Sequence, residues 1–161
     1  MQKYRLRSGR QWYVAAVVLD DEIVTQPARS LLKLANLENL LAHELVHLHI
    51  KSVAGRNCPR WLDEGLAQWL AGQKAGLADS AELKLPGNEK ELAQLEQRLT
   101  SSNSSREEMK TDYKTCLLLV DRIIRQQSIE LLLGVLSQLK THKQPLSIEL
   151  NGKTLKQMLF K

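Results

Sequence analysis

Two short stretches constrain this chain more than any other feature: LLAHELVHLHI at residues 40–50 and PRWLDEGLAQWLAG at residues 59–72. The first places three of the chain's four histidines within seven positions of an apolar segment. His43 and His47 stand four apart, so on a helix their side chains share a face, with β-carbons about 5–6 Å apart. One metal ion can bridge that gap. We therefore expect a helix here and polar groups from elsewhere packed against its histidine face.

Local sequence signals predict where two helices around these stretches begin and end. Asn36 is a suitable N-cap for a helix over about residues 37–53, and Gly55 interrupts the pattern after it. Pro59 is tolerated at the start of a second helix, which we expect to end near Leu70.

We expect the first helix to have an apolar side that faces away from His43 and His47. His49 points away from His43 and His47, so we assign it a structural or surface role. Four leucines gather at helical spacing and are expected to form the apolar back of the helix: Leu37, Leu41, Leu45 and Leu48.

Glu44 completes the pattern His-Glu-x-x-His, in which two neutral imidazoles hold zinc and the glutamate takes a proton from zinc-bound water. The alternative is that His43 and His47 cap or pair on an exposed helix face. A catalytic zinc needs a third protein ligand. Glu64, seventeen residues after His47 and on the second helix, is the candidate.

The second helix also divides into two faces. Gln68 lies one turn beyond Glu64 on the same face, where its amide could orient a ligand. Asp63 points elsewhere, and we expect it to cap the helix or to make a surface ion pair. The opposite face carries the apolar residues Leu62, Leu66 and Trp69.

With HELVH followed by CPRWLDEGLAQWLAG, the sequence resembles the gluzincin zinc metallopeptidases, and most of all the small bacterial peptidase-MA-like domains. The resemblance covers residues 37–72 well and the remainder loosely. It implies a zincin-like fold and a protease (hydrolase) that uses Zn²⁺. It also implies that His43, His47 and Glu64 are the metal ligands and that Glu44 is the general base.

Two related groups differ from this chain at definable positions. Metzincins would have glycine and histidine where Ile50 and Val53 stand. Zinc aminopeptidases carry a Gly-x-Met-Glu-Asn segment upstream of the zinc helix, and residues 1–42 contain none. The resemblance therefore favours endopeptidase-like action.

Downstream, the small domains resemble this chain again where a tyrosine opens a helix, which here is Tyr113. The resemblance makes Tyr113 the candidate catalytic donor to the oxyanion that forms as water attacks a carbonyl. The alternative is that Tyr113 only packs beneath the helix. His142 is the substitute for that role, and we expect packing roles for Tyr4 and Tyr13.

The remaining sequence predicts an α+β chain that is mostly helical, with a small N-terminal hairpin within residues 12–26. Capping patterns at Asn88, Ser105 and Ser128 predict three more helices, and TSSNSS at residues 100–105 predicts a connecting loop. The tail 147–159 suits either a hairpin or a short helix. We expect one domain over residues 1–161, possibly excised from a longer chain.

Composition limits the classes of partner. The net charge of +5 is scattered, apart from a cluster at Lys3, Arg5, Arg7 and Arg10, so no nucleic-acid partner is expected. No apolar run is long enough to span a bilayer, and no signal peptide is recognised. The compartment stays open between the cytoplasm and a mature exported fragment. The two cysteines are expected to be buried small hydrophobic residues.

Zinc-dependent hydrolysis of peptide bonds in a peptide or protein substrate is thus the leading functional hypothesis. One alternative is a zinc-containing binding or regulatory module with vestigial or very restricted peptidase activity. Another is a nucleic-acid-associated protein whose basic N-terminus docks phosphates. Retention of Glu44 argues against the first alternative, because a structural zinc site has no use for a base.

Overall fold

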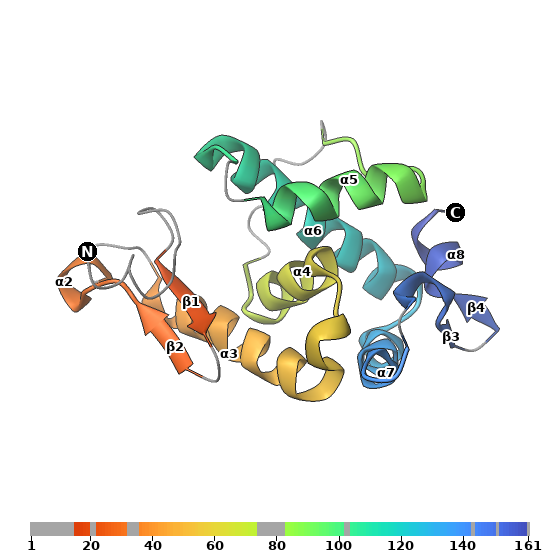
Figure 1. The fold of residues 1–161 in the computed structure, drawn as a ribbon, viewed down its shortest axis with the longest axis horizontal. Helices are drawn as coiled ribbons and strands as arrows, with labels where there is room; N and C mark the ends of the chain where they lie inside the picture. The colour runs from red at the N-terminus through yellow and green to blue at the C-terminus, as the bar shows by residue number, and fades with distance from the viewer. Residues whose placement is uncertain are drawn as a thin grey trace.

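The computed structural model describes residues 15–19, 22–31, 36–73, 83–101, 104–142, 144–150 and 152–160. The chain is mostly helical with a small N-terminal antiparallel hairpin, as predicted (Figure 1). The basic cluster near the N-terminus, Tyr4 and Tyr13 lie outside the described residues. The elements are β1 Ala16–Leu19, β2 Glu22–Thr25, α2 Ala28–Leu31, α3 Leu37–Ala54, η1 Gly55–Asn57, α4 Arg60–Leu70, α5 Glu89–Thr100, α6 Arg106–Gln126, α7 Ile129–Leu139, η3 Pro145–Ser147, β3 Glu149–Leu150, β4 Lys153–Thr154 and α8 Leu155–Leu159.

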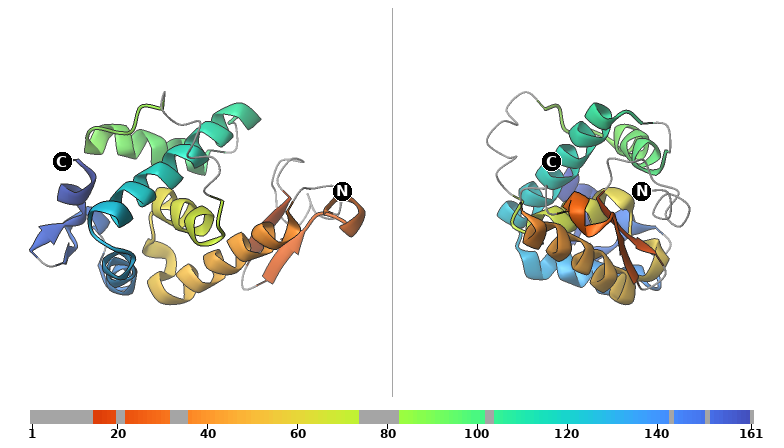
Figure 2. Two further views of the ribbon diagram at one scale, coloured as in Figure 1. Left: turned by 180° about the vertical axis from the view of Figure 1, so that it is seen from behind. Right: turned by 90° about the vertical axis from the view of Figure 1, so that its left-hand side faces the viewer.

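Helix α4 lies at the centre, in contact with α3, α5 and α6 (Figures 1 and 2). Leu62 and Leu66 are fully buried, as the sequence predicted. The first N–H groups of a helix have no partner within it. Here the backbone N–H groups of Arg60 and Trp61 donate to the two carboxylate oxygens of Glu96 on α5, at 2.7 and 3.0 Å. This contact fixes where α4 begins and how it is oriented.

Helices α4 and α6 are in close contact at Gly65. A β-carbon at this position would lie 2.4 Å from the backbone oxygen of Cys116 and 2.6 Å from Cγ2 of Val120. Only glycine fits that spacing without movement of a helix. The residue before it, Glu64, is therefore held at a fixed distance from α6.

Helix α3 begins where the sequence predicted, with the Asn36 side chain accepting a hydrogen bond from the Asn39 N–H at 3.4 Å. The prediction of a leucine-lined buried face is wrong, because Leu41 is 38% exposed and Leu45 is 57% exposed. The side of α3 that packs inward carries His43 and His47, together with residues such as Ile50. This polar side can be buried because α4 supplies partners for it.

The hairpin pairs β1 with β2 in antiparallel register from Ala16 opposite Thr25 to Leu19 opposite Glu22. Strand β1 also packs against α3. Figure 2 shows that this hairpin and the β3–β4 pair lie at opposite ends of the molecule. Residues 15–18 of the hairpin line the same cavity as His43 and His47 of α3.

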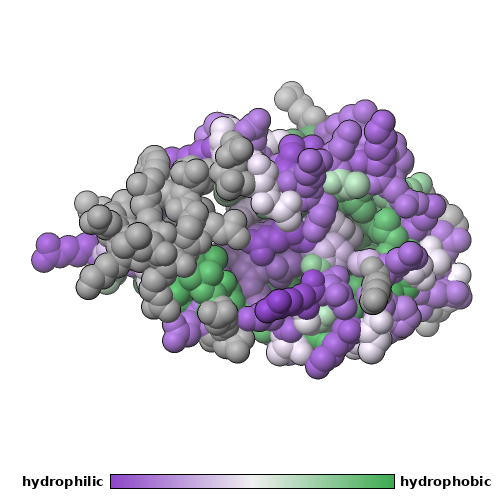
Figure 3. All heavy atoms as spheres, viewed as in Figure 1, coloured by the Kyte–Doolittle hydropathy of each residue, from purple (hydrophilic) through white to green (hydrophobic). Residues whose placement is uncertain are grey.

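Helices α5, α6 and α7 begin at the predicted caps. Ser105 forms a reciprocal capping box with Glu108, and the side chains of Asn88 and Ser128 each accept a backbone N–H at the third helical position. The ambiguous tail contains both expected structures, since the β3–β4 pair is followed directly by α8. Cys116 is buried and Cys58 is half-buried, and both are free thiols. Among the helices within the described ranges, none is both long and apolar enough to cross a membrane. Figure 3 shows that hydrophilic residues cover much of one face of the molecule, with smaller hydrophobic areas between them.

Candidate metal centre

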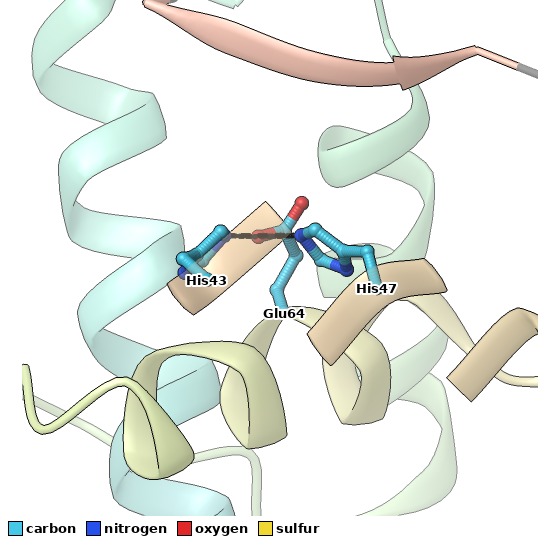
Figure 4. A group of neighbouring side chains, drawn as sticks. All are labelled: His43, His47 and Glu64. Atoms are coloured by element: carbon cyan, nitrogen blue, oxygen red, sulfur yellow. Dashed lines mark hydrogen bonds and ion pairs between the residues drawn. The ribbon is translucent and has the colours of Figure 1, made fainter. Parts of the chain in front are cut away.

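Helices α3 and α4 bring His43, His47 and Glu64 into one group. Figure 4 shows Glu64 projecting from α4 toward the two imidazoles of α3. The two Nε2 atoms of the histidines are 3.0 Å apart, and Oε2 of Glu64 lies 3.4 Å from Nε2 of His43 and 3.6 Å from Nε2 of His47. The rings meet edge to face, at an interplanar angle of 83°. These three side chains can hold a metal ion.

The separations between these atoms match a tetrahedral ion. Zinc bonds of about 2.0–2.2 Å to nitrogen and oxygen, at tetrahedral angles, place pairs of ligand atoms about 3.3–3.6 Å apart. The two distances that involve Glu64 fall in this range, and the distance between the histidines is a few tenths of an ångström shorter. The donor set of two imidazoles and one carboxylate suits zinc and also other divalent transition metals. The geometry therefore supports a metal site without identifying the ion.

Two buried polar atoms in the group have no hydrogen-bond partner among the described residues: Nδ1 of His43 and Oε2 of Glu64. A proton shared between the two imidazoles would satisfy the short contact between His43 and His47. It would leave Oε2 of Glu64 without a partner, and an unsatisfied buried carboxylate oxygen is costly. A cation among the three atoms would resolve this.

The carboxylate of Glu64 is anionic despite its burial. Burial alone raises the pKa of a carboxyl group. For Glu64 that effect is outweighed by the charge of Arg60 and by the two histidines, which hold its pKa well below the ordinary value. The nearest atom of Arg60, its Nη2, lies 2.6 Å from Oε1 of Glu64. Arg60 therefore contacts one oxygen of the carboxylate and leaves the other directed at the histidines.

Asp63 belongs to this site, which corrects the prediction that it points elsewhere. Its Oδ1 lies 2.7 Å from Nδ1 of His47, and its Oδ2 lies 3.3 Å from Nη1 of Arg60. The sequence predicted an ion pair for Asp63 without naming its partner, which is Arg60. The contact with His47 was not predicted. A carboxylate on Nδ1 holds the proton there and leaves Nε2 free to bind a metal. Helix positions alone mislead here, because a short side chain can reach sideways across the interface between α3 and α4.

The pKa of His47 reflects the same surroundings. Burial lowers the pKa of an imidazole. The hydrogen bond with Asp63 and the charge of Glu64 outweigh this effect and raise the pKa of His47 to about 10. The surroundings of His47 thus favour a positive charge at this position.

Glu44 lies beside the group and is 5% exposed. Burial raises its pKa, and His43 and His47 offset only part of that rise. A carboxylate with a raised pKa is a better proton acceptor near neutral pH. Glu44 and the three candidate ligands line one cavity of about 630 Å³, and Ala15–Val18 of the β1 region form another part of its wall.

Tyr113 of α6 is half-buried and lines the same cavity, and it makes a side-chain hydrogen bond with Arg60. Gln68 lies behind Glu64, where its amide donates to the backbone oxygens of Glu64 and Tyr113 at 3.1 and 2.9 Å. Gln68 therefore links α4 to α6 through the backbone.

The other two histidines lie apart from the group. His49 is exposed, as expected. His142 is exposed at the end of α7, with Nδ1 3.0 Å from the oxygen of Gln138, and it is not among the residues that line the cavity. Arg60 was not recognised from the sequence, although its spacing of three and four residues from Asp63 and Glu64 is typical of helical ion pairs.

Comparisons of the chain with known proteins find no match. No family model, no curated protein and no solved structure matches the chain. The resemblance to gluzincins therefore depends on the two motifs, and the arrangement of His43, His47 and Glu64 is consistent with a zincin site without establishing that family.

Proposed function

We propose that this protein is a zinc-dependent peptidase of the gluzincin type that cleaves internal peptide bonds. The observation that carries the proposal is the convergence of two imidazoles and one unpartnered carboxylate oxygen beside a buried glutamate, within one open cavity. His43, His47 and Glu64 would hold the ion. Zinc bound there would polarise a substrate carbonyl and make water acidic enough to attack it near neutral pH.

The protein groups supply the remaining chemistry. Glu44 accepts the proton of the attacking water and returns it to the leaving amine. Tyr113 donates a hydrogen bond to the oxygen of the carbonyl as negative charge develops on it. Strand β1 pairs only with β2 among the described strands, and Ala15–Val18 lie along the cavity. An extended substrate can therefore form main-chain hydrogen bonds with β1.

Metal analysis combined with a quenched-fluorescence peptide assay tests this proposal. The wild-type protein is expected to bind about one zinc ion and to hydrolyse the peptide. Glu44→Gln is expected to keep the zinc and lose hydrolysis, whereas Glu38→Gln, at an exposed position on the same helix, keeps both. Equal activity of wild type and Glu44→Gln would contradict the role of Glu44. Absence of zinc binding would contradict the whole proposal.

A further inference from the structure

Four basic side chains that are exposed or half-buried line the cavity, and we name these four residues the cationic rim: Lys51, Arg56, Arg106 and Lys110. Arg56, Arg106 and Lys110 are exposed and Lys51 is half-buried. The acidic residues that line the cavity lie deeper, with Glu44 and Glu64 buried and Asp63 16% exposed at its side chain. The charges of the cavity are thus partly separated: the three carboxylates lie deeper, two of them paired with Arg60, and the four rim cations are more exposed.

Three of the rim residues, Arg56, Arg106 and Lys110, retain their charge for a ligand. Within the described ranges, Lys110 forms an ion pair only with the exposed Glu107, and a pair between two exposed side chains is weak. Arg56 and Arg106 make no ion pair with another residue in the described ranges. On α6, the spacing of Arg106, Lys110 and Tyr113 places all three on the face that lines the cavity.

We propose that the cationic rim selects peptides with acidic side chains on either side of the bond that is cleaved. The inference rests on the proposed function, because it names the substrate class of that same cavity. A peptide is favoured over a nucleic acid because the edge of β1, which lines the cavity, can hydrogen-bond a peptide main chain. Electrostatic attraction by the rim would mainly speed association and would weaken with salt.

The test compares matched peptides that carry Glu or Gln at the flanking positions. With wild-type protein, the Glu peptide is expected to have the higher kcat/KM at low salt. In the double variant Arg106→Gln/Lys110→Gln this preference should fall by about 3- to 20-fold, the combined effect of two exposed ion pairs. Lys90→Gln, at an exposed position on α5 outside the cavity, should leave the preference unchanged.

Peptide binding, measured by fluorescence anisotropy, separates this inference from the proposed function. A preference for the Glu peptide that depends on Arg106 and Lys110, in a protein without hydrolysis, would support the rim and contradict the peptidase. Equal binding of Glu and Gln peptides would overturn the rim. Tighter, rim-dependent binding of a single-stranded oligonucleotide than of the Glu peptide would also overturn it, in favour of phosphate recognition.

The side chain of Arg60 contacts several groups of the candidate metal centre. Its guanidinium contacts Oε1 of Glu64 at 2.6 Å and Oδ2 of Asp63 at 3.3 Å, and it also hydrogen-bonds Tyr113. Asp63 in turn contacts His47. One side chain therefore orients two of the three candidate ligands and the candidate oxyanion donor.

We infer that Arg60 is a positioning residue for the metal site. The inference needs the proposed metal site but not peptidase activity. A positive charge near a cation repels it, so a neutral side chain would strengthen metal binding if charge were the only role of Arg60. If Arg60 positions Glu64 and Asp63, the same substitution must weaken metal binding. The two roles predict opposite signs.

Titration of zinc into the metal-free protein distinguishes them. Arg60→Gln is expected to lower zinc affinity by about 10- to 100-fold, the usual effect of losing a group that orients a ligand. Arg60→Lys, which keeps the charge but loses the two-sided contact, should also bind more weakly than wild type. Arg125→Gln, which breaks an exposed pair with Asp121, should not change the affinity.

A cobalt-substituted sample gives a second readout, because its visible absorption responds to the positions of the ligands. The spectrum of Arg60→Gln is expected to differ from that of wild type, whereas simple loss of stability would not change it. Unchanged or tighter zinc binding by Arg60→Gln would overturn the positioning role alone. Absence of zinc binding by wild type would overturn this inference together with the proposed function.

Discussion

The contact between α4 and α6 makes Gly65→Ala a sharp test of the fold around the site. The new β-carbon would lie 2.4 Å from the backbone oxygen of Cys116, whereas ordinary contacts begin near 3.4 Å. The two helices must therefore separate by about 1 Å. A backbone oxygen cannot rotate away, as the end of a flexible side chain can. The substitution therefore strains the centre of the core.

The expected loss of stability follows from two opposing effects. Alanine is favoured over glycine in a helix by about 0.5–1 kcal/mol. Overpacking a well-filled core costs about 1–3 kcal/mol, occasionally more, and a contact of 2.4 Å with backbone belongs at the upper end. After the gain from alanine is subtracted, the net loss is about 2 kcal/mol. For a chain of this size, that lowers Tm by about 3–10 °C.

Thermal unfolding followed by circular dichroism, in the presence of a chelator, measures this loss without a contribution from bound metal. Gly87→Ala is the matched control, because its nearest neighbour would be a side-chain oxygen of Glu91 at 3.8 Å. Its Tm should stay close to wild type. Zinc affinity of Gly65→Ala should also fall, since Glu64 moves with α4. Wild-type stability in Gly65→Ala would refute the close contact and with it the placement of Glu64.

Three further predictions test local features. In metal-free protein, the raised pKa of His47 implies a contribution to stability that is complete below about pH 6.5 and is lost as pH rises toward 10. Urea titrations between neutral pH and pH 9 should therefore show a fall in the free energy of unfolding, and this fall should be smaller in His47→Gln. Asp112→Asn should cost about 1–3 kcal/mol by the same assay, because the buried Asp112 accepts three hydrogen bonds from Arg98 and that side chain is half exposed. Ser105→Ala should cost about 1 kcal/mol through loss of its capping box, and an unchanged urea midpoint would contradict that role.

The sequence predicts those parts of the fold whose cause is local. The starts of α3, α5, α6 and α7 follow from Asn36, Asn88, Ser105 and Ser128, because a capping side chain bonds a backbone N–H only three residues away. The start of α4 is different. Its first N–H groups are satisfied by Glu96, which is 36 residues from Arg60 in the chain, and no local pattern indicates that contact.

In the candidate site too, local spacing explains some contacts and the packing of helices explains others. The spacing of His43 and His47 on one helix brings those two side chains together without reference to the rest of the fold. The position of Glu64 relative to them depends on how α3 packs against α4. The role of Asp63 was missed for that reason, since its partner His47 is sixteen residues away on the other helix.

The buried face of α3 follows from the charges on α4. A polar face is buried only when its groups find partners, since an unpaired buried charge costs several kcal/mol. Arg60 and Asp63 satisfy most of the groups on this interface, while Oε2 of Glu64 stays without a hydrogen-bond partner in the described part of the chain. Three carboxylates, those of Glu44, Asp63 and Glu64, line the cavity together with the guanidinium of Arg60, which contacts Asp63 and Glu64 on its own helix. The excess of negative charge favours a positive charge in this place, which either a protonated His47 or a bound cation supplies. Exposure of Leu41 and Leu45 is the consequence, because α3 can turn only one side toward α4.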